Sequence, residues 1–149
     1  MFGLRLCRDR FPQEMSVRLR ILIVDDHELV RRGIAALLLS RNSVELCGEA
    51  SNGEEAIQKA AELRPDLIIL DVTMPVLNGL EAARRIRESL PSVPILMLSM
   101  HDGPQIIEEV KLAGAQGFLS KNDVAGVLLQ AVDTLVQGGK FFAGSGVAT

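Results

Sequence analysis

The sequence contains few aromatic residues and few cysteines. Its 149 residues include no tryptophan and no tyrosine, and the two cysteines are Cys7 and Cys47. Two cysteines that form no CxxC pair exclude a disulfide framework and argue against a structural zinc site. This cysteine usage is typical of a reducing compartment, so we expect a cytoplasmic protein.

The chain also lacks long apolar runs and an excess of positive charge. Its most apolar stretches, residues 67–70 and 95–98, fall far short of the ~20 residues that cross a bilayer, and no membrane partner is expected. The net charge of −3 excludes a broad basic surface, so we expect no direct nucleic-acid binding by this segment. Residues 1–18 lack the apolar region of a secretory signal, and we expect a disordered extension there.

Short apolar runs alternate with segments of helical period from Leu19 onward. This alternation predicts βαβ units around a parallel sheet, in one α/β domain over residues 19–138. The second and fifth runs look more polar than the others, which predicts peripheral strands. The expected strands cover residues 19–24, 44–49, 67–70, 95–99 and 117–119.

Local signals mark where some helices begin. Asn52 and Glu55 have the spacing of a capping box. Asn122 or Asp123 is positioned to cap the last predicted helix. These signals support the helical segments that the apolar period indicates.

Polar residues follow the predicted strands at the points where each strand ends. Asp25 and Asp26 follow the first strand, Asp71 the third and Lys121 the fifth, while Ser99 ends the fourth. Crossover connections place the carboxyl ends of parallel strands at one edge, where open α/β sheets bind ligands. Adjacent carboxylates persist only with compensating charge, and Mg²⁺ prefers such oxygen ligands. The site therefore suits phosphoryl transfer to a carboxylate.

These residues together resemble the motif set of response regulator receiver domains over residues 19–137. The resemblance rests on the Asp25-Asp26 pair, the run Asp71-Val72-Thr73-Met74-Pro75, Gly79, Ser99 and Lys121. It implies a flavodoxin-like, doubly wound (βα)5 fold whose five-stranded parallel sheet has the order 2-1-3-4-5. The NarL/LuxR-type subfamily, whose receivers carry a helix-turn-helix domain, has a segment similar to VDDHELVRRG at residues 24–33.

The resemblance also implies a role for each residue at the site. Asp71 would be the phosphoacceptor of a two-component system, with a sensor histidine kinase as its partner. Asp25, Asp26, Asp71 and the backbone carbonyl of Thr73 would hold Mg²⁺, and Lys121 would contact the phosphoryl group. The chain would be a switch rather than an enzyme, with self-catalysed phosphorylation and dephosphorylation. A homodimer formed on phosphorylation is a candidate signalling state.

Two further residues resemble the elements that couple phosphorylation to a surface change. The Ser99 hydroxyl would move toward the phosphate while the Phe118 ring swings inward. Phe118 lacks the hydroxyl of the more familiar tyrosine, so this coupling would rest on ring packing. Asn122 stands where many receivers have proline, which leaves the isomer of the Lys121–Asn122 peptide bond open.

The remaining polar candidates are two histidines and a group of arginines. His101 and Thr73 occupy positions that in the family flank the phosphoryl group and tune its hydrolysis, although His101 as a plain loop residue is an open alternative. His27 is expected to be a helix cap or a surface residue without a catalytic role. A solvated helix face is predicted for three arginines, namely Arg84, Arg85 and Arg87.

Other functions of the same fold class fit the residues less well. A nucleotide or flavin site would need a glycine-rich first turn where this chain has Asp25-Asp26. A phosphatase of the haloacid-dehalogenase type would need an aspartate in place of Thr73. A pseudo-receiver that binds partners without phosphorylation stays an alternative, against which Asp71 and Lys121 argue.

The final segment, residues 139–149, is too short for a DNA-binding domain. We expect it to be the start of a linker or a C-terminal tail, either of a regulator cut after its receiver or of a stand-alone receiver. The subfamily resemblance favours the first, with transcription as the output.

Overall fold

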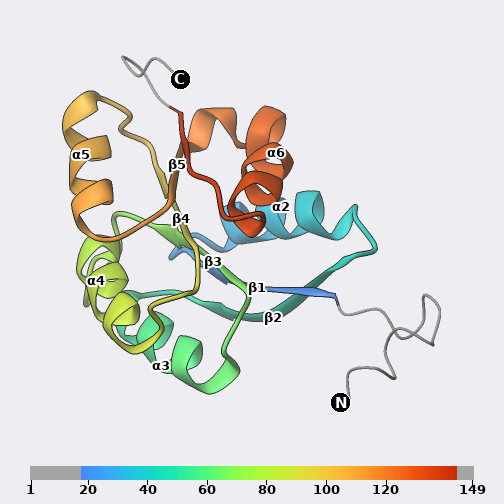
Figure 1. Ribbon diagram of the computed structural model, residues 1–149, viewed down its shortest axis with the longest axis horizontal. Helices are drawn as coiled ribbons and strands as arrows, with labels where there is room; N and C mark the ends of the chain where they lie inside the picture. The colour runs from blue at the N-terminus through green and yellow to red at the C-terminus, as the bar shows by residue number, and fades with distance from the viewer. Residues whose placement is uncertain (1–17, 144–149) are drawn as a thin grey trace.

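The computed structural model describes residues 18–143, in which strands and helices alternate along the chain (Figure 1). Cys7 and the expected extension, apart from Arg18, lie outside the described residues, as do residues 144–149. The strands are β1 (Leu19–Val24), β2 (Val44–Ala50), β3 (Leu67–Asp71), β4 (Ile95–Ser99), β5 (Gly117–Ser120) and β6 (Phe141–Phe142). The helices are α2 (Glu28–Leu39), α3 (Gly53–Leu63), α4 (Gly79–Ser89), α5 (Pro104–Leu112) and α6 (Val124–Val136), with a 3-10 turn, η2 (Lys121–Asp123).

All paired strands run parallel, in the order β2-β1-β3-β4-β5-β6. Helices α2 and α6 cover one face of the sheet, and α3, α4 and α5 cover the other (Figure 1). Each face has its own apolar core, because side chains of the central strands alternate between faces and both faces are buried. The predicted doubly wound α/β fold and the order 2-1-3-4-5 are confirmed. None of the described helices is long and apolar enough to cross a membrane.

A sixth strand extends the sheet beyond the five that the sequence predicts. Phe141 and Phe142 of β6 pair with Gly117 and Phe118 of β5, and Phe141 N donates to Gln116 O at 3.0 Å. Two residues carry no readable strand period, so this pairing arises from the open edge of β5, whose backbone groups need partners. β5 is consequently internal and buried throughout, and its prediction as a peripheral strand was wrong.

The predicted capping box at the start of α3 is confirmed, whereas the predicted cap of α6 is not. Asn52 Oδ1 accepts a hydrogen bond from Glu55 N at 2.9 Å. The Asp123 side chain makes no cap hydrogen bond. Instead Ser120 Oγ accepts one from Asn122 N at 3.2 Å, because the turn η2 separates β5 from α6.

A polar cluster lies at the amino edge of the sheet, where α4 ends. Arg87 donates from Nε to Gly114 O at 3.1 Å, from Nη1 to the carbonyls of Leu90 and Pro91 at 3.2 and 2.9 Å, and from Nη2 to Gln116 Oε1 at 2.8 Å. We call Arg87 and these acceptors the amino-edge cluster. The prediction that Arg87 lies on a solvated face was wrong, since its guanidinium is held inside this cluster.

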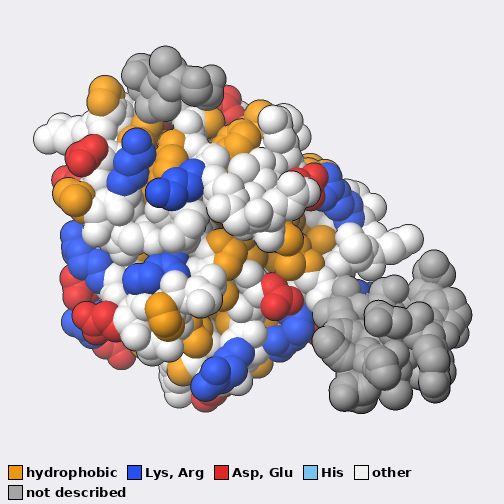
Figure 2. Space-filling view, viewed as in Figure 1, with side chains coloured by type: hydrophobic (Ala, Val, Ile, Leu, Met, Phe, Trp, Pro, Cys, Tyr) orange, Lys and Arg blue, Asp and Glu red, His pale blue; other side chains and the backbone are white. Residues whose placement is uncertain are grey.

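The other two arginines of the predicted group do lie on the surface. Arg84 Nη1 and Arg85 Nε pair with the Glu81 carboxylate at 3.1 and 3.2 Å. Side chains of both charges are mixed over α4 (Figure 2). Exposed pairs of this kind contribute little to stability.

Candidate functional site

The carboxyl ends of the central strands bring the predicted site residues together. Asp25, Asp71 and Ser99 are buried, with exposed fractions of 0, 3 and 2%. Lys121 Nζ lies 2.7 Å from Asp25 Oδ2 and 3.2 Å from Asp71 Oδ2. We call Asp25, Asp26, Asp71 and Lys121 the carboxyl-edge cluster. It forms because β1, β3 and β5 end at the same edge of the sheet, with Asp71 as the last residue of β3 and charged residues directly after β1 and β5.

The charges in this cluster do not balance. Burial and the nearby Asp25 carboxylate raise the pKa of Asp71 to about 6, although Lys121 and the Thr73 backbone act in the opposite direction. Burial lowers the pKa of Lys121, but the carboxylates of Asp25 and Asp71 outweigh it and hold that pKa above its ordinary value. One ammonium group therefore serves two carboxylates, and a further cation beside them would be stabilised.

The donor atoms present fit a hard divalent cation. Asp25, Asp26, His27 and Asp71 each offer an atom, and these atoms lie within 4.8 Å of one another. Asp25 Oδ2 and Asp26 Oδ1 are buried without an aligned hydrogen bond, and their contacts are ion pairs with Lys121 and with His27. Carboxylate oxygens are the ligands that Mg²⁺ prefers, so the cluster fits that ion.

A hollow of about 510 Å³ opens beside the cluster. It gives a substrate or an ion access to Asp71, whose own surface is almost wholly enclosed. Thr73 and His101 both line it, in keeping with their predicted position around a reacting group. Its walls are Asp26, His27, Asp71, Thr73, Met74, Pro75, Met100, His101 and Lys121.

Close backbone packing holds the loop that follows Asp71. Gly79 N donates to Val72 O at 2.8 Å, and a Cβ atom on Gly79 would lie 1.9 Å from Asp71 O. Glycine at position 79 therefore lets α4 begin directly against the end of β3.

A tight turn lies in the same loop. Leu77 N donates to Pro75 O at 2.7 Å, which closes a three-residue turn around Val76, whose φ is 69°. Such a turn is strained for a β-branched residue.

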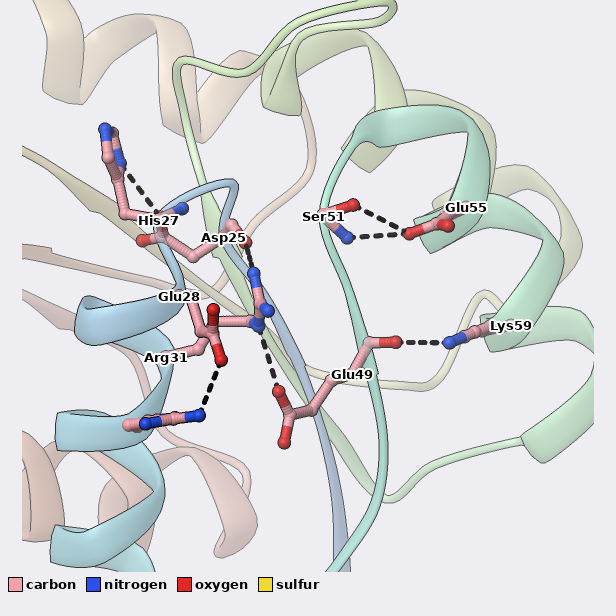
Figure 3. A network of polar contacts seen from close by, with 9 residues as sticks. Asp25, His27, Glu28, Arg31, Glu49, Ser51, Glu55 and Lys59 are labelled. Carbon is pink, nitrogen blue, oxygen red and sulfur yellow. Dashed lines mark hydrogen bonds and ion pairs between the residues drawn. The ribbon is translucent and has the colours of Figure 1, made fainter.

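Arg31 holds the acidic end of β1 in place, a role that the sequence did not indicate. Its Nη1 donates to Asp25 O at 2.6 Å, and its Nε pairs with Glu49 Oε1 at 2.9 Å (Figure 3). Lys59 Nζ in turn donates to the Glu49 carbonyl. No local pattern could have revealed this, because the three elements involved meet only in the folded sheet.

The remaining candidates are placed as follows. Ser99 Oγ accepts a hydrogen bond from His101 N at 2.9 Å, and the Phe118 ring is fully buried. No peptide bond in residues 18–143 is cis, so the bond between Lys121 and Asn122 is trans. His27 occupies the N-cap position of α2 without making a side-chain cap.

Comparison with known proteins identifies the family. Residues 21–133 match the response regulator receiver domain. The chain belongs to this family. The carboxyl-edge cluster lies within the matched segment, so it is part of the receiver domain.

Curated relatives of this receiver are response regulators and transcriptional regulatory proteins. It is 42% identical over 121 residues to the transcriptional regulatory protein LnrK of Bacillus subtilis, covering 81% of this chain and 55% of that protein. It is 37% identical over 125 residues to the response regulator UvrY of Escherichia coli, covering 84% of this chain and 57% of that protein. The chain therefore spans about half the length of the curated relatives that it matches.

Solved structures resemble the receiver over most of the chain. A two-component response regulator of the LuxR family from Aurantimonas superposes with a TM-score of 0.80 at 33% identity, covering 85% of this chain and 89% of that one. The signal receiver domain of the putative response regulator NarL from Mycobacterium tuberculosis gives a TM-score of 0.78 at 33% identity, covering 83% and 99%. The predicted resemblance to NarL/LuxR-type receivers is confirmed.

Proposed function

We propose that Asp71 accepts a phosphoryl group from a sensor histidine kinase, with Mg²⁺ bound beside it. The observation that carries this proposal is the Asp71 carboxylate itself. It is buried at the end of β3, lies 3.2 Å from Lys121 Nζ and borders the hollow. A carboxylate nucleophile beside a fixed positive charge is the arrangement that phosphoryl transfer requires.

The ligands for Mg²⁺ would be the carboxylates of Asp25, Asp26 and Asp71 and the backbone carbonyl of Thr73. Thr73 N donates to Asp71 Oδ1 at 3.4 Å, which keeps the start of this loop against the carboxylate. When bound, the ion supplies charge that neutralises the oxygens of the transferring group. The imbalance of charge in the carboxyl-edge cluster supports this assignment.

In the transfer step, an Asp71 oxygen forms a bond to phosphorus while the bond from phosphorus to the donor nitrogen breaks. Lys121, already held between Asp25 and Asp71, pairs with the phosphoryl oxygens and orients them. Attack of water on the same phosphorus later releases phosphate and restores the Asp71 carboxylate. Thr73 and His101 at the wall of the hollow would tune the access of that water. The chain is thus a switch that is modified and reset at its own site, not an enzyme acting on an external substrate.

The switch would begin at Ser99. To reach a phosphoryl group on Asp71, the Ser99 hydroxyl gives up the hydrogen bond that it accepts from His101 N, and this frees the loop before α5. The Phe118 ring is fully buried in this structure, so any coupling through it would rest on ring packing. The surface at α5 and β5 would then present an altered face to a second receiver.

We infer that this output controls transcription. The relative LnrK supports this, because it is a transcriptional regulatory protein. The matched segment covers 55% of LnrK and 57% of UvrY, which leaves room in each for a further domain. We propose that residues 19–138 form the receiver and that residues 139–149 lead into a linker, of which Phe141 and Phe142 also pair with β5 as the strand β6. A DNA-binding domain would carry the output. We propose a cytoplasmic location, in keeping with the cysteine usage of the sequence.

Mass spectrometry of the intact protein tests the phosphorylation step. The protein is incubated with acetyl phosphate and Mg²⁺, beside an Asp71→Asn variant and a sample with excess chelator. We expect a single phosphoryl adduct on the wild type and none in either control. If a folded wild type forms no adduct with acetyl phosphate or a phosphorylated kinase, the proposal is wrong and a phosphorylation-independent interaction module takes its place.

A further inference from the structure

His27 lies against the carboxylates that would hold Mg²⁺. Its Nδ1 is 3.3 Å from Asp25 Oδ1 and 3.1 Å from Asp26 Oδ1, and its backbone N donates to Asp25 Oδ1 at 2.9 Å. Figure 3 shows His27 and Asp25 near one another at the turn into α2. The imidazole is therefore held beside the acidic pair by its own backbone, although two thirds of the side chain is exposed.

The spacing of these atoms is that of neighbouring ligands on one metal ion. Metal–ligand bonds of about 2.1 Å at right angles put adjacent ligand atoms roughly 3.0 Å apart. The two measured separations from His27 Nδ1, 3.1 and 3.3 Å, are close to this value. All four donor residues keep one atom within 4.8 Å of the others. No large movement is needed for the imidazole and the carboxylates to share an ion.

A second observation comes from the buried carboxylate oxygens. Asp26 Oδ1, the atom next to His27 Nδ1, is buried without an aligned hydrogen bond. Asp25 is fully enclosed, but its Oδ2 is paired with Lys121 Nζ at 2.7 Å, so the unsatisfied oxygen is the one beside the imidazole. Buried carboxylate oxygens in native proteins are normally satisfied, so such an atom beside an imidazole indicates a ligand that binds at that place.

We propose that His27 is a ligand for divalent transition metals, so that the site binds ions such as Co²⁺ through three carboxylates and one imidazole. This proposal extends the proposed function, since it uses the same carboxylates as the Mg²⁺ site. Imidazole nitrogen is a good ligand for Co²⁺, Ni²⁺ and Zn²⁺, whereas Mg²⁺ takes oxygen ligands and keeps its waters. His27 therefore sets which metal the receiver prefers, and a transition ion would compete with Mg²⁺ for one place.

Cobalt is the probe because its visible absorption reports ligand nitrogen directly. We would titrate Co²⁺ and, separately, Mg²⁺ into the wild type, His27→Ala, and His101→Ala by calorimetry, and record the Co²⁺ spectrum of each. His101 is the matched control, because it is the second of the two histidines in the chain and lines the same hollow. Thermal unfolding of each variant shows that it is folded.

We expect His27→Ala to weaken Co²⁺ binding by about tenfold and to change the Co²⁺ spectrum, while Mg²⁺ binding changes by less than about twofold. His101→Ala should leave both affinities near the wild-type values. The proposal is overturned if wild type and His27→Ala bind Co²⁺ alike, if both metals weaken by the same factor, or if the wild type binds no Co²⁺. The Mg²⁺-dependent adduct on Asp71 is measured separately, so its presence would keep the phosphorylation proposal intact in each of these cases.

Discussion

The two edges of the sheet carry polar clusters of opposite character. At the amino edge, the Arg87 guanidinium donates to three carbonyls and to Gln116, so each of its bonds has a neutral acceptor. At the carboxyl edge, Asp25 and Asp71 repel one another across a single ammonium group, and the pKa of Asp71 is raised to about 6. The first cluster is complete by itself, and the second becomes complete only with a bound cation.

We therefore associate the amino-edge cluster with the stability of the domain and the carboxyl-edge cluster with its function. A satisfied buried network rigidifies the fold, whereas a cluster with unpaired buried atoms costs free energy until a ligand relieves it. Perturbed carboxylates of this kind gather at functional sites. We therefore expect substitutions at the amino edge to lower stability and some substitutions at the carboxyl edge to raise it.

The largest effect should come from replacing the glycine that packs against the end of β3. A Cβ atom at position 79 would lie 1.9 Å from Asp71 O, so Gly79→Ala should lower the free energy of unfolding by about 3 kcal/mol or more. Urea unfolding followed by far-ultraviolet circular dichroism measures this. Gly33→Ala is the control, because a Cβ there meets no atom within 4 Å and alanine favours the helix by up to about 1 kcal/mol. Equal effects of the two variants would contradict the packing argument.

Breaking the amino-edge cluster should have the next largest effect. Arg87→Met keeps the length of the side chain but removes the donor to the Pro91 carbonyl and one of two donors to each of the Gly114 and Leu90 carbonyls. We expect a loss of about 2–3 kcal/mol in the same urea measurement. Arg84→Met, on the exposed face of the same helix, should change stability by less than about 0.5 kcal/mol. A similar loss for both variants would mean that Arg87 acts only through its charge.

Removing the charge of Asp71 at the carboxyl edge should raise the free energy of unfolding, whereas the two substitutions above should lower it. The folded-state pKa of Asp71 lies above its ordinary value of 3.8, at about 6, so the ionised group destabilises the fold above pH 6. Without metal at pH 7.5, Asp71→Asn should raise the free energy of unfolding by about 2 kcal/mol.

The pH dependence of the stability gained by Asp71→Asn tests whether the gain is electrostatic. Below pH 6 the folded wild type binds a proton before the unfolded chain does, so its stability rises and the advantage of Asp71→Asn shrinks toward pH 4. Saturating Mg²⁺ should also shrink the advantage, because the ion stabilises the wild type by binding its folded state. A gain that stays constant from pH 7.5 to pH 5 would refute the electrostatic explanation.

The smallest expected effect concerns Arg31, which donates a hydrogen bond to the backbone carbonyl of Asp25. Arg31→Met removes the bond to the Asp25 carbonyl and the pair with Glu49, so the acidic turn is less well fixed. We expect Mg²⁺ affinity to fall by about tenfold, as is common when a group that orients metal ligands is lost. Calorimetric titration measures this.

Arg32→Met is the matched control for this variant. It lies one residue further along α2, where its guanidinium pairs with Glu28 at 2.7 Å on the exposed surface. Its Mg²⁺ affinity should stay within about twofold of the wild type, because an exposed pair away from the ligands contributes little. If both variants lose affinity equally, the loss reflects overall charge and not the position of Asp25.

Much of the site follows from local patterns along the chain. The apolar runs before Asp25, Asp71 and Lys121 predict parallel strands, and parallel strands in crossover order share one edge for their carboxyl ends. That reasoning alone brings the three charged residues together. The capping box at Asn52 follows in the same way, because both partners lie within a single turn of helix.

Contacts between distant segments were beyond such reasoning. The sixth strand depends on an open edge of β5, and the placement of Arg87 depends on carbonyls at the end of α4 and before β5. Arg31 reaches Asp25 and Glu49 only because α2 packs beside β1 and β2.

The sequence by itself thus determined the alternation of strands and helices and which residues end at the functional edge, because these depend on period and on parallel connectivity. The resemblance of its motif residues indicated the family. The tertiary structure alone decided how the charges there are balanced: the buried state of Asp71, the reach of Lys121 to two carboxylates, and the contact of His27 with the acidic pair. Burial and distance set the energy of a charge, and neither is encoded in local spacing.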